Sequence, residues 1–284
     1  MISEAEWKRF IEDLKTDGKA TQAELKEAIV KAIKKNIPKE KFGIMFSGGI
    51  DSTFIAYICE QAGADFTCYA VGLEESPDIE YAKWVAYELG FDLKMKVFSL
   101  DEAEEVIKKV TLLFNEPDAV KISIACVFYA AMELAAKDGI KKMFSGLGSE
   151  EIFAGYERHK IGDINEECWK GLLSMYKRDL LRDWRLADVF GMKLLTPFLE
   201  PGVIRLGMQF PADEKVSDEY KKIILRKIAD DIGIPKEIAW RKKKAAQYGS
   251  RFDKAIQKLA KKNGFKLKKD YLKSLLISSS FSKK

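Results

Sequence analysis

The first forty residues show the apolar spacing of two amphipathic helices. Each begins at a residue pair with capping-box spacing, Ser3 with Glu6 and Thr21 with Glu24. Apolar residues then recur three and four positions apart, which places them on one face of a helix. The first stripe is Trp7, Phe10, Ile11 and Leu14, and the second is Leu25, Ala28, Ile29, Ala32 and Ile33. We predict that both helices pack through these stripes.

From residue 42 onward, strand-like and helix-like segments alternate. Short apolar runs predict strands at 42–46, 66–73, 93–98 and 140–144. Segments with helical spacing lie between them, at 52–63, 78–90, 101–114 and 119–137. This alternation predicts an α/β fold, a Rossmann-like, doubly wound parallel sheet with helices on both faces.

Beyond about residue 160 no clear strand is visible, and helical patterns continue to the end of the chain. The 284 residues show no internal repeat and suffice for one large domain or two smaller ones. We therefore expect an N-terminal helical segment (1–40), an α/β core (41–160) and a helical C-terminal part (161–284).

The composition narrows the class of protein and of partner. Apolar residues at 47% and charged residues at 33% are typical of a globular chain, and the net charge of +5 suits an anionic substrate without arguing for nucleic acid. The four cysteines form no CxxC pair and mostly lie in apolar runs, which indicates reduced packing residues. Because no apolar stretch looks long enough to span a membrane and no signal peptide is visible, we expect a cytoplasmic protein without a membrane partner.

The first predicted strand ends in the sequence SGGIDS, from Ser47 to Ser52. Two adjacent glycines, Gly48 and Gly49, let the backbone turn tightly and expose its N–H groups. A strand that ends in such a turn and leads into a helix forms a nest of donors for an anion, with the helix dipole behind it. The two serine hydroxyls add further donors. The alternative is an ordinary strand–turn–helix connection.

Three further stretches carry polar residues for the rim where doubly wound sheets bind ligands, outside the carboxyl ends of the strands. They are VGLEESPD (71–78), FSGLGSEEIFAGY (144–156) and WRKKKAAQYGS (240–250). Glu150 or Glu151 could complete an oxygen-rich magnesium site with Asp51, or the two acids could form a solvated pair at a helix N-terminus. The basic run in the third stretch has the alternative of a solvated helix face.

Taken together, these stretches resemble a known family. SGGIDS is similar to the pyrophosphate loop (PP-loop, residues 47–52 here) of the N-type ATP pyrophosphatases. The others resemble one branch of it, the synthetase domain of asparagine synthetase and its β-lactam-forming relatives, whose segments are VGL-x-x-SPD, SGEGSDE-x-F-x-GY, PFLD and WR-x-K. The PFLD segment corresponds to TPFLEPGVIRLGMQFP, and the matches keep the family's order from about residue 42 to 250. The resemblance implies an adenine nucleotide alpha hydrolase-like fold.

The resemblance also implies an AMP-forming carbon–nitrogen ligase that uses ATP and Mg²⁺. In such enzymes a substrate carboxylate attacks the α-phosphate of ATP, and an amine then displaces AMP from the acyl-adenylate to leave an amide. Carried over to this chain, the catalytic residues are Lys243 and Asp51, and the magnesium ligands are Asp51 and Glu150. The nucleotide-binding residues are Met45, Ser47, Gly48, Gly49, Asp51, Ser52, Val71, Ser145 and Gly146. Main-chain groups of Met45 and Val71 match those that contact the adenine edge.

The chain departs from the family's pattern on the acceptor side. The glutamate of SGEGSDE is Leu147, and the arginine that would pair with an aspartate substrate falls near Ile124, so aspartate is not assigned as the substrate carboxylate. Asparagine synthetases begin with the catalytic cysteine of a glutaminase domain, whereas this chain begins Met1-Ile2-Ser3. We therefore expect a stand-alone synthetase domain that takes ammonia or another amine from solution or from a separate glutaminase.

Two other functions stay open. One is a PP-loop enzyme that modifies RNA: the lack of a CxxC sulfur relay and of a separate RNA-binding module leads us to expect no nucleic-acid partner, although the basic tail from Lys254 to Lys273 leaves room for one. The other is a non-catalytic nucleotide-binding protein. His159 could act as a general base or only cap or pack. The sequence also leaves a homo-oligomer open.

Overall fold

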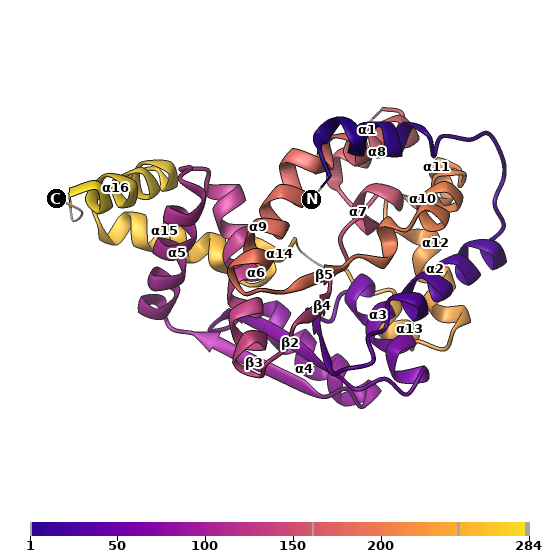
Figure 1. The fold of residues 1–284 in the computed structure, drawn as a ribbon, viewed down its shortest axis with the longest axis horizontal. Helices are drawn as coiled ribbons and strands as arrows, with labels where there is room; N and C mark the ends of the chain where they lie inside the picture. Colours follow the sequence, from indigo (N-terminus) through magenta and orange to yellow (C-terminus); the bar gives the residue numbers. More distant parts are fainter. Residues whose placement is uncertain (1, 161, 243–244, 282–284) are drawn as a thin grey trace.

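The computed structural model describes residues 2–160, 162–242 and 245–281. Within these residues it forms a five-stranded parallel sheet in the order β3-β2-β1-β4-β5 (Figure 1). The strands are β1 (Phe42–Met45), β2 (Phe66–Leu73), β3 (Leu93–Phe98), β4 (Lys142–Phe144) and β5 (Lys193–Leu195). The doubly wound parallel sheet predicted from the alternating pattern is confirmed.

The strand order reverses direction between β1 and β4. The chain first adds β2 and β3 on one side of β1 and then returns to place β4 on the other side. Phe42 of β1 lies opposite Phe66 of β2, and Ile44 of β1 lies opposite Phe144 of β4. In doubly wound sheets such a reversal opens a crevice at the carboxyl ends of the two strands. The PP-loop follows β1, and the SGLGSEE segment follows β4.

Strand β5 corrects the expectation that no strand follows residue 160. It has three residues, Lys193–Leu195, and pairs with β4 at the edge of the sheet. Three residues are too few to show a strand period, and only Leu195 among them is buried. Pairing with the existing edge, not a local pattern, therefore defines this strand.

Helices cover both faces of the sheet and extend beyond it, with α15 and α16 beside α5, and α1 beside α8 (Figure 1). The N-terminal half contains α1 (Glu4–Glu12), α2 (Gln22–Asn36), α3 (Ile50–Gln61), α4 (Pro77–Leu89), α5 (Leu100–Phe114), α6 (Ala119–Lys137) and α7 (Ser149–Ile152). The C-terminal half contains α8 (Ile164–Met175), α9 (Leu181–Val189), α10 (Pro201–Met208), α11 (Ala212–Lys215), α12 (Ile223–Asp231), α13 (Lys236–Ala239), α14 (Ala246–Gly249), α15 (Phe252–Lys262) and α16 (Lys268–Phe281). Shorter turns are η1 (Glu157–Lys160), the π-helical η2 (Tyr176–Leu180) and η3 (Pro197–Leu199).

Local signals explain where several helices begin. Ser3 and Thr21 form complete capping boxes with Glu6 and Glu24, as their spacing predicts. Each hydroxyl accepts a hydrogen bond from a backbone N–H of the first turn, and each glutamate carboxylate accepts one from the N–H of the capping residue. Each box thus satisfies two N–H donors that the helix itself leaves unpaired. Both predicted N-terminal helices are confirmed, and their apolar stripes are largely buried.

Alternate residues of the strands enter two apolar cores. Phe66, Cys68 and Ala70 of β2 pack into one core with residues of α1, α2, α3 and α12. Tyr69 and Val71 point to the other face and pack with residues of α5, α6 and α15. Burial on both faces is the main stabilising contribution for such a sheet, at about 25 cal/mol per Å² of apolar surface. The four cysteines are buried and not joined by disulfides, consistent with reduced packing residues.

Helix α6 corrects the expectation that no apolar stretch could span a membrane. Its 19 residues are long and apolar enough by length and composition alone. Half of the tested window is buried inside the protein, and α6 packs against α5, α9 and α15. A helix buried in a protein core can have the same composition as a membrane-spanning helix. Length and composition therefore do not decide between these two roles for α6.

Lys215 is a charged residue in the protein interior, with none of its surface exposed. Its Nζ donates a hydrogen bond to Asn165 Oδ1 at 2.8 Å, and no carboxylate of the described chain pairs with it. Burial lowers the pKa of Lys215 to about 8, although the nearby Cys168 acts in the opposite direction.

We expect Lys215→Met to raise the free energy of unfolding at pH 7 by about 1–3 kcal/mol, because it removes the cost of burying an ammonium group. The folded pKa of about 8 lies below the ordinary value of 10.5, so the unfolded chain binds more protons between these two pH values. The stability of the natural protein therefore rises with pH in that window, and the gain from the substitution is full below pH 8 and fades toward pH 10.5. Denaturant unfolding at both ends of the window, with exposed Lys19→Met as the control, measures this. A pH-independent loss of stability would contradict it.

Candidate active site

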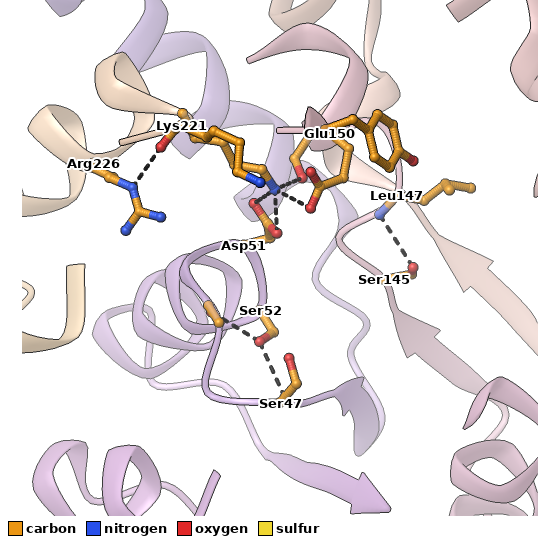
Figure 2. A network of polar contacts seen from close by, with 12 residues as sticks. Ser47, Asp51, Ser52, Ser145, Leu147, Glu150, Lys221 and Arg226 are labelled. Carbon is orange, nitrogen blue, oxygen red and sulfur yellow. Dashed lines mark hydrogen bonds and ion pairs between the residues drawn. The ribbon is translucent and has the colours of Figure 1, made fainter. Parts of the chain in front are cut away.

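The PP-loop joins β1 to the N-terminus of α3. Gly48 has a φ of 61°, and a Cβ at this position would lie 2.8 Å from the carbonyl oxygen of Tyr81, so the turn requires glycine. The Ser47 N–H donates to Ser52 Oγ at 3.4 Å, and the Ser52 hydroxyl donates to the Gly49 carbonyl at 3.2 Å (Figure 2). Gly49 caps α3 without a side-chain hydrogen bond. The first N–H groups of this helix thus lack a side-chain cap, which suits a bound anion.

Asp51 and Glu150 converge on one ammonium group (Figure 2). Asp51 lies in the first turn of α3, the helix that follows β1 in the chain. Glu150 lies in the first turn of α7, the helix that follows β4. Nζ of Lys222 lies 2.8 Å from each Asp51 carboxylate oxygen and 2.7 Å from Glu150 Oε1. The structure therefore brings together the two carboxylates that the resemblance assigns to magnesium.

Lys222 was not identified by sequence reasoning. It lies in the segment YKKIILRK (220–227), where a lysine pair before an apolar run is typical of a solvated helix start. In the structure it is 4% exposed. Burial disfavours its charged form, but Asp51 and Glu150 outweigh that effect and raise the pKa of Lys222. An ammonium group that is charged at neutral pH therefore belongs to the site, and no local sequence pattern indicates it.

The donor set fits magnesium. Among residues 2–160, 162–242 and 245–281, no three or more His, Cys, Asp or Glu side chains gather closely enough to hold a metal ion. Mg²⁺ usually keeps several waters and binds through one or two carboxylates together with substrate phosphates. Two carboxylates beside the PP-loop match that mode.

The turn after β4 packs directly against the PP-loop. The Ser145 N–H donates to the Leu195 carbonyl at 2.9 Å, and the Leu147 N–H donates to Ser145 Oγ at 3.3 Å (Figure 2). A Cβ at Gly146 would lie 2.8 Å from Cβ of Asp51, so glycine permits this close approach. Ser145 and Gly146 therefore lie beside Asp51, as the resemblance implies.

Met45 and Val71 lie at the carboxyl ends of neighbouring strands. Met45, the last residue of β1, is opposite Tyr69 of β2. Val71 lies two residues beyond the end of this ladder and pairs with Lys96 of β3 on its other side. On the side of β2 that faces β1, the backbone of Val71 therefore has no partner residue within β1. It lies at the rim of the sheet, where the resemblance implies the adenine contact.

Arg241 ties the segment at 240–242 to the PP-loop. Its Nη2 donates to the Gly48 carbonyl at 2.9 Å, and its guanidinium lies 3.7 Å from the ring centroid of Tyr81. Cation–π contact and a charge-assisted hydrogen bond together fix the orientation of an arginine. The loop and this late segment are therefore held as one unit.

Arg226 anchors the same segment from the other side. It donates to the carbonyl of Lys221 at 2.7 Å (Figure 2) and to the carbonyl of Arg241 at 3.1 Å. Lys243, the catalytic lysine implied by the resemblance, and its neighbour Lys244 lie outside the described residues. The residues just before Lys243 are thus bound to the PP-loop and to α12.

The asparagine synthase family model matches residues 24–171 and 161–272 of the chain. The chain belongs to the asparagine synthase family. It is 33% identical to an asparagine synthetase [glutamine-hydrolyzing] of Methanocaldococcus jannaschii, over 90% of this chain and 56% of that protein. It is 29% identical to the root asparagine synthetase of Pisum sativum and 26% identical to asparagine synthetase B of Escherichia coli, over 80% and 82% of this chain and 42% and 46% of those proteins. The chain thus spans about half the length of these relatives, and the resemblance stated from the motifs is confirmed.

Two positions at which this asparagine synthase family member departs from the motifs named above carry apolar side chains. Leu147, in place of the motif's glutamate, is half-buried and packs against the apolar core that contains Phe66 and Cys68. Ile124, near the position of the expected arginine, is a half-buried residue of α6. Neither side chain can pair with a charged substrate group.

Glu151 is buried rather than solvated, so the alternative of a solvated acid pair is wrong for this residue. It is 1% exposed and accepts a hydrogen bond from Nη2 of Arg178. Burial raises the pKa of Glu151 to about 7, and Arg178 acts in the opposite direction. Arg178 also donates from Nε to Asp179 at 2.6 Å, within the π-helical turn η2. This buried network braces α7, and hence Glu150, against η2.

His159 is fully buried. Its Nδ1 accepts a hydrogen bond from the Tyr156 backbone N–H at 3.3 Å. Burial lowers the pKa of His159 to about 4, so the imidazole is neutral at physiological pH. This arrangement fits the packing role rather than a general base in contact with solvent.

Proposed function

We propose that this chain activates a carboxylate with MgATP and joins it to an amine. A carboxylate oxygen attacks the α-phosphorus, pyrophosphate leaves, and the amine then attacks the acyl carbon and displaces AMP while losing a proton. Membership of a family whose named relatives are asparagine synthetases supports this reaction class. The observation that carries the proposal is the convergence of Asp51 and Glu150 from the segments that follow β1 and β4, where the strand order reverses.

The residues of the site have complementary roles in this proposal. The N–H groups and hydroxyls of residues 47–52, with the dipole of α3, would hold the departing pyrophosphate. Asp51 and Glu150 would hold Mg²⁺, which neutralises charge on the phosphates when it is bound. Lys222 adds a buried cation beside the two carboxylates. Met45 and Val71 would contact the adenine edge through main-chain groups.

The substrate acid in this proposal carries a less polar remainder than aspartate. Leu147 and Ile124 support this choice, because a buried charge left without a partner is strongly disfavoured. The amine is ammonia or a small primary amine. We therefore do not propose aspartate as the substrate, and the screen described next includes it.

A screen for ATP–pyrophosphate exchange across carboxylic acids, aspartate included, tests the proposal. We expect exchange that depends on the acid and on Mg²⁺, and net AMP formation only when ammonia or an amine is added. Reactions without acid give the baseline. ATP binding without exchange for any acid would favour a non-catalytic nucleotide-binding protein.

The RNA-modifying alternative has one observation in its favour. Residues 251–273, in α15 and the start of α16, contain nine basic and two acidic residues, a charge of +7 against +5 for the whole chain. Phosphate backbones bind such clusters and release counterions. If pyrophosphate release depended on added transfer RNA and not on a carboxylic acid, this alternative would replace the proposal.

A further inference from the structure

The ammonium of Lys222 lies where a cation shared by Asp51 and Glu150 would lie. It contacts three carboxylate oxygens at 2.7 to 2.8 Å and Ser149 Oγ at 3.0 Å. These four acceptors use all three of its N–H donors. Figure 2 shows the carboxylates of Asp51 and Glu150 pointing toward one another, with these contacts drawn between them.

We infer that Lys222 is an internal counter-ion that holds the carboxylate pair together and excludes a free divalent metal until MgATP displaces it. This inference rests on the proposed function only in assigning Asp51 and Glu150 to magnesium. It adds that metal binding at the pair requires the nucleotide, and that Lys222 sets this requirement.

The surroundings are built around the ammonium. Lys222 has a φ of 59°, a left-handed conformation that non-glycine residues rarely adopt. A Cβ at Gly155 would lie 1.7 Å from Glu150 Oε2 and 2.5 Å from Cε of Lys222, so a glycine makes room for both side chains. The backbone therefore places this lysine between the carboxylates at a conformational cost.

Electrostatics makes the lysine and a bare metal ion mutually exclusive. The two carboxylates and Lys222 sum to one negative charge, and the lysine side chain is 6% exposed, against 20% for Asp51 and 38% for Glu150. A divalent ion between Asp51 and Glu150 would meet the ammonium at close range, and repulsion between like charges at such a distance is strong even near a protein surface. A nucleotide removes this conflict, because its phosphates supply negative charge for both cations.

Mn²⁺ alone, without nucleotide, is the probe for this inference, because the fraction bound can be followed by electron paramagnetic resonance. A binding site that is occupied by an internal competitor shows its intrinsic affinity only when the competitor is removed. We expect Lys222→Met to bind Mn²⁺ at least about tenfold more tightly than the natural protein. The double variant Lys222→Met/Asp51→Asn should lose this gain, because the pair is then broken.

Lys221→Met is the matched control. Lys221 is the neighbouring lysine, but its Nζ pairs with Glu157 at 2.5 Å, a carboxylate outside the Asp51–Glu150 pair. This variant should bind Mn²⁺ as the natural protein does. If folded Lys222→Met binds Mn²⁺ no more tightly than Lys221→Met, the inference is overturned.

A measurement on the natural protein covers the case in which Lys222→Met does not fold. Hydrogen exchange at 221–226 should be unchanged by Mg²⁺ alone and altered by Mg²⁺ with an α,β-methylene ATP analogue. A change with Mg²⁺ alone would overturn the inference. No response to the analogue would count against the proposed function, whereas the measurement with Mg²⁺ alone needs no nucleotide and still tests the role of Lys222.

Discussion

Asp51→Asn is expected to lower acid-dependent pyrophosphate release by about two to three orders of magnitude, the typical effect of removing one preorganised electrostatic contact to a transition state. The substitution keeps the size of the side chain and removes the charge that Lys222 and, by proposal, Mg²⁺ share. Initial rates of pyrophosphate release at saturating MgATP, with the acid found in the screen, measure the effect.

Glu60→Gln is the matched control for Asp51→Asn. Glu60 lies on the same helix, α3, but near its other end, where it is exposed. Removing its charge should leave the rate unchanged. Thermal unfolding of both variants separates catalysis from stability, since Asp51→Asn also leaves the buried Lys222 with one carboxylate instead of two. An Asp51→Asn rate within a few-fold of the natural rate would exclude Asp51 from the reaction.

Much of the fold is predictable from the sequence because its signals are local. Helix α5 begins at Ser99 with a capping box, and α4 ends at Gly90 in a left-handed conformation. Strand β2 has one polar residue, Thr67, and is buried over all eight residues, as expected for a strand covered on both faces. Strand β5 escapes prediction because its three residues owe their conformation to pairing with β4.

Some residues of the candidate site are likewise predictable from local sequence signals, and others are not. The PP-loop and the SGLGSEE turn are contiguous, and parallel strands bring their carboxyl ends to one edge, so the meeting of Asp51 and Glu150 follows from the topology. Lys222 is separated from Asp51 by 171 positions and from Glu150 by 72. Its role depends on how the C-terminal helices pack on the sheet, which no local pattern specifies. The same holds for Arg241 and its contact with Gly48.

Lys243→Ala is expected to keep ATP affinity within about threefold of the natural value and to lower pyrophosphate exchange by about two to three orders of magnitude. An ammonium that meets charge only as the α-phosphorus becomes pentavalent stabilises mainly the transition state, so its loss affects turnover more than binding. The position of Lys243 in this prediction comes from the WR-x-K resemblance. The contacts of Arg226 and Arg241 hold the residues just before Lys243 beside the PP-loop.

Lys242→Ala provides the comparison that makes the Lys243 result interpretable. Its side chain is 66% exposed and pairs with Glu219 at 3.6 Å, so it points to solvent beside the same loop. It carries the same charge at the adjacent position, and its loss should change exchange little, as is usual for an exposed ion pair. Calorimetric ATP binding and isotope exchange on both variants separate affinity from chemistry. If both variants lose ATP binding equally, the basic run acts only as an electrostatic patch; if Lys243→Ala exchanges pyrophosphate as fast as Lys242→Ala, the lysine of this segment is not catalytic.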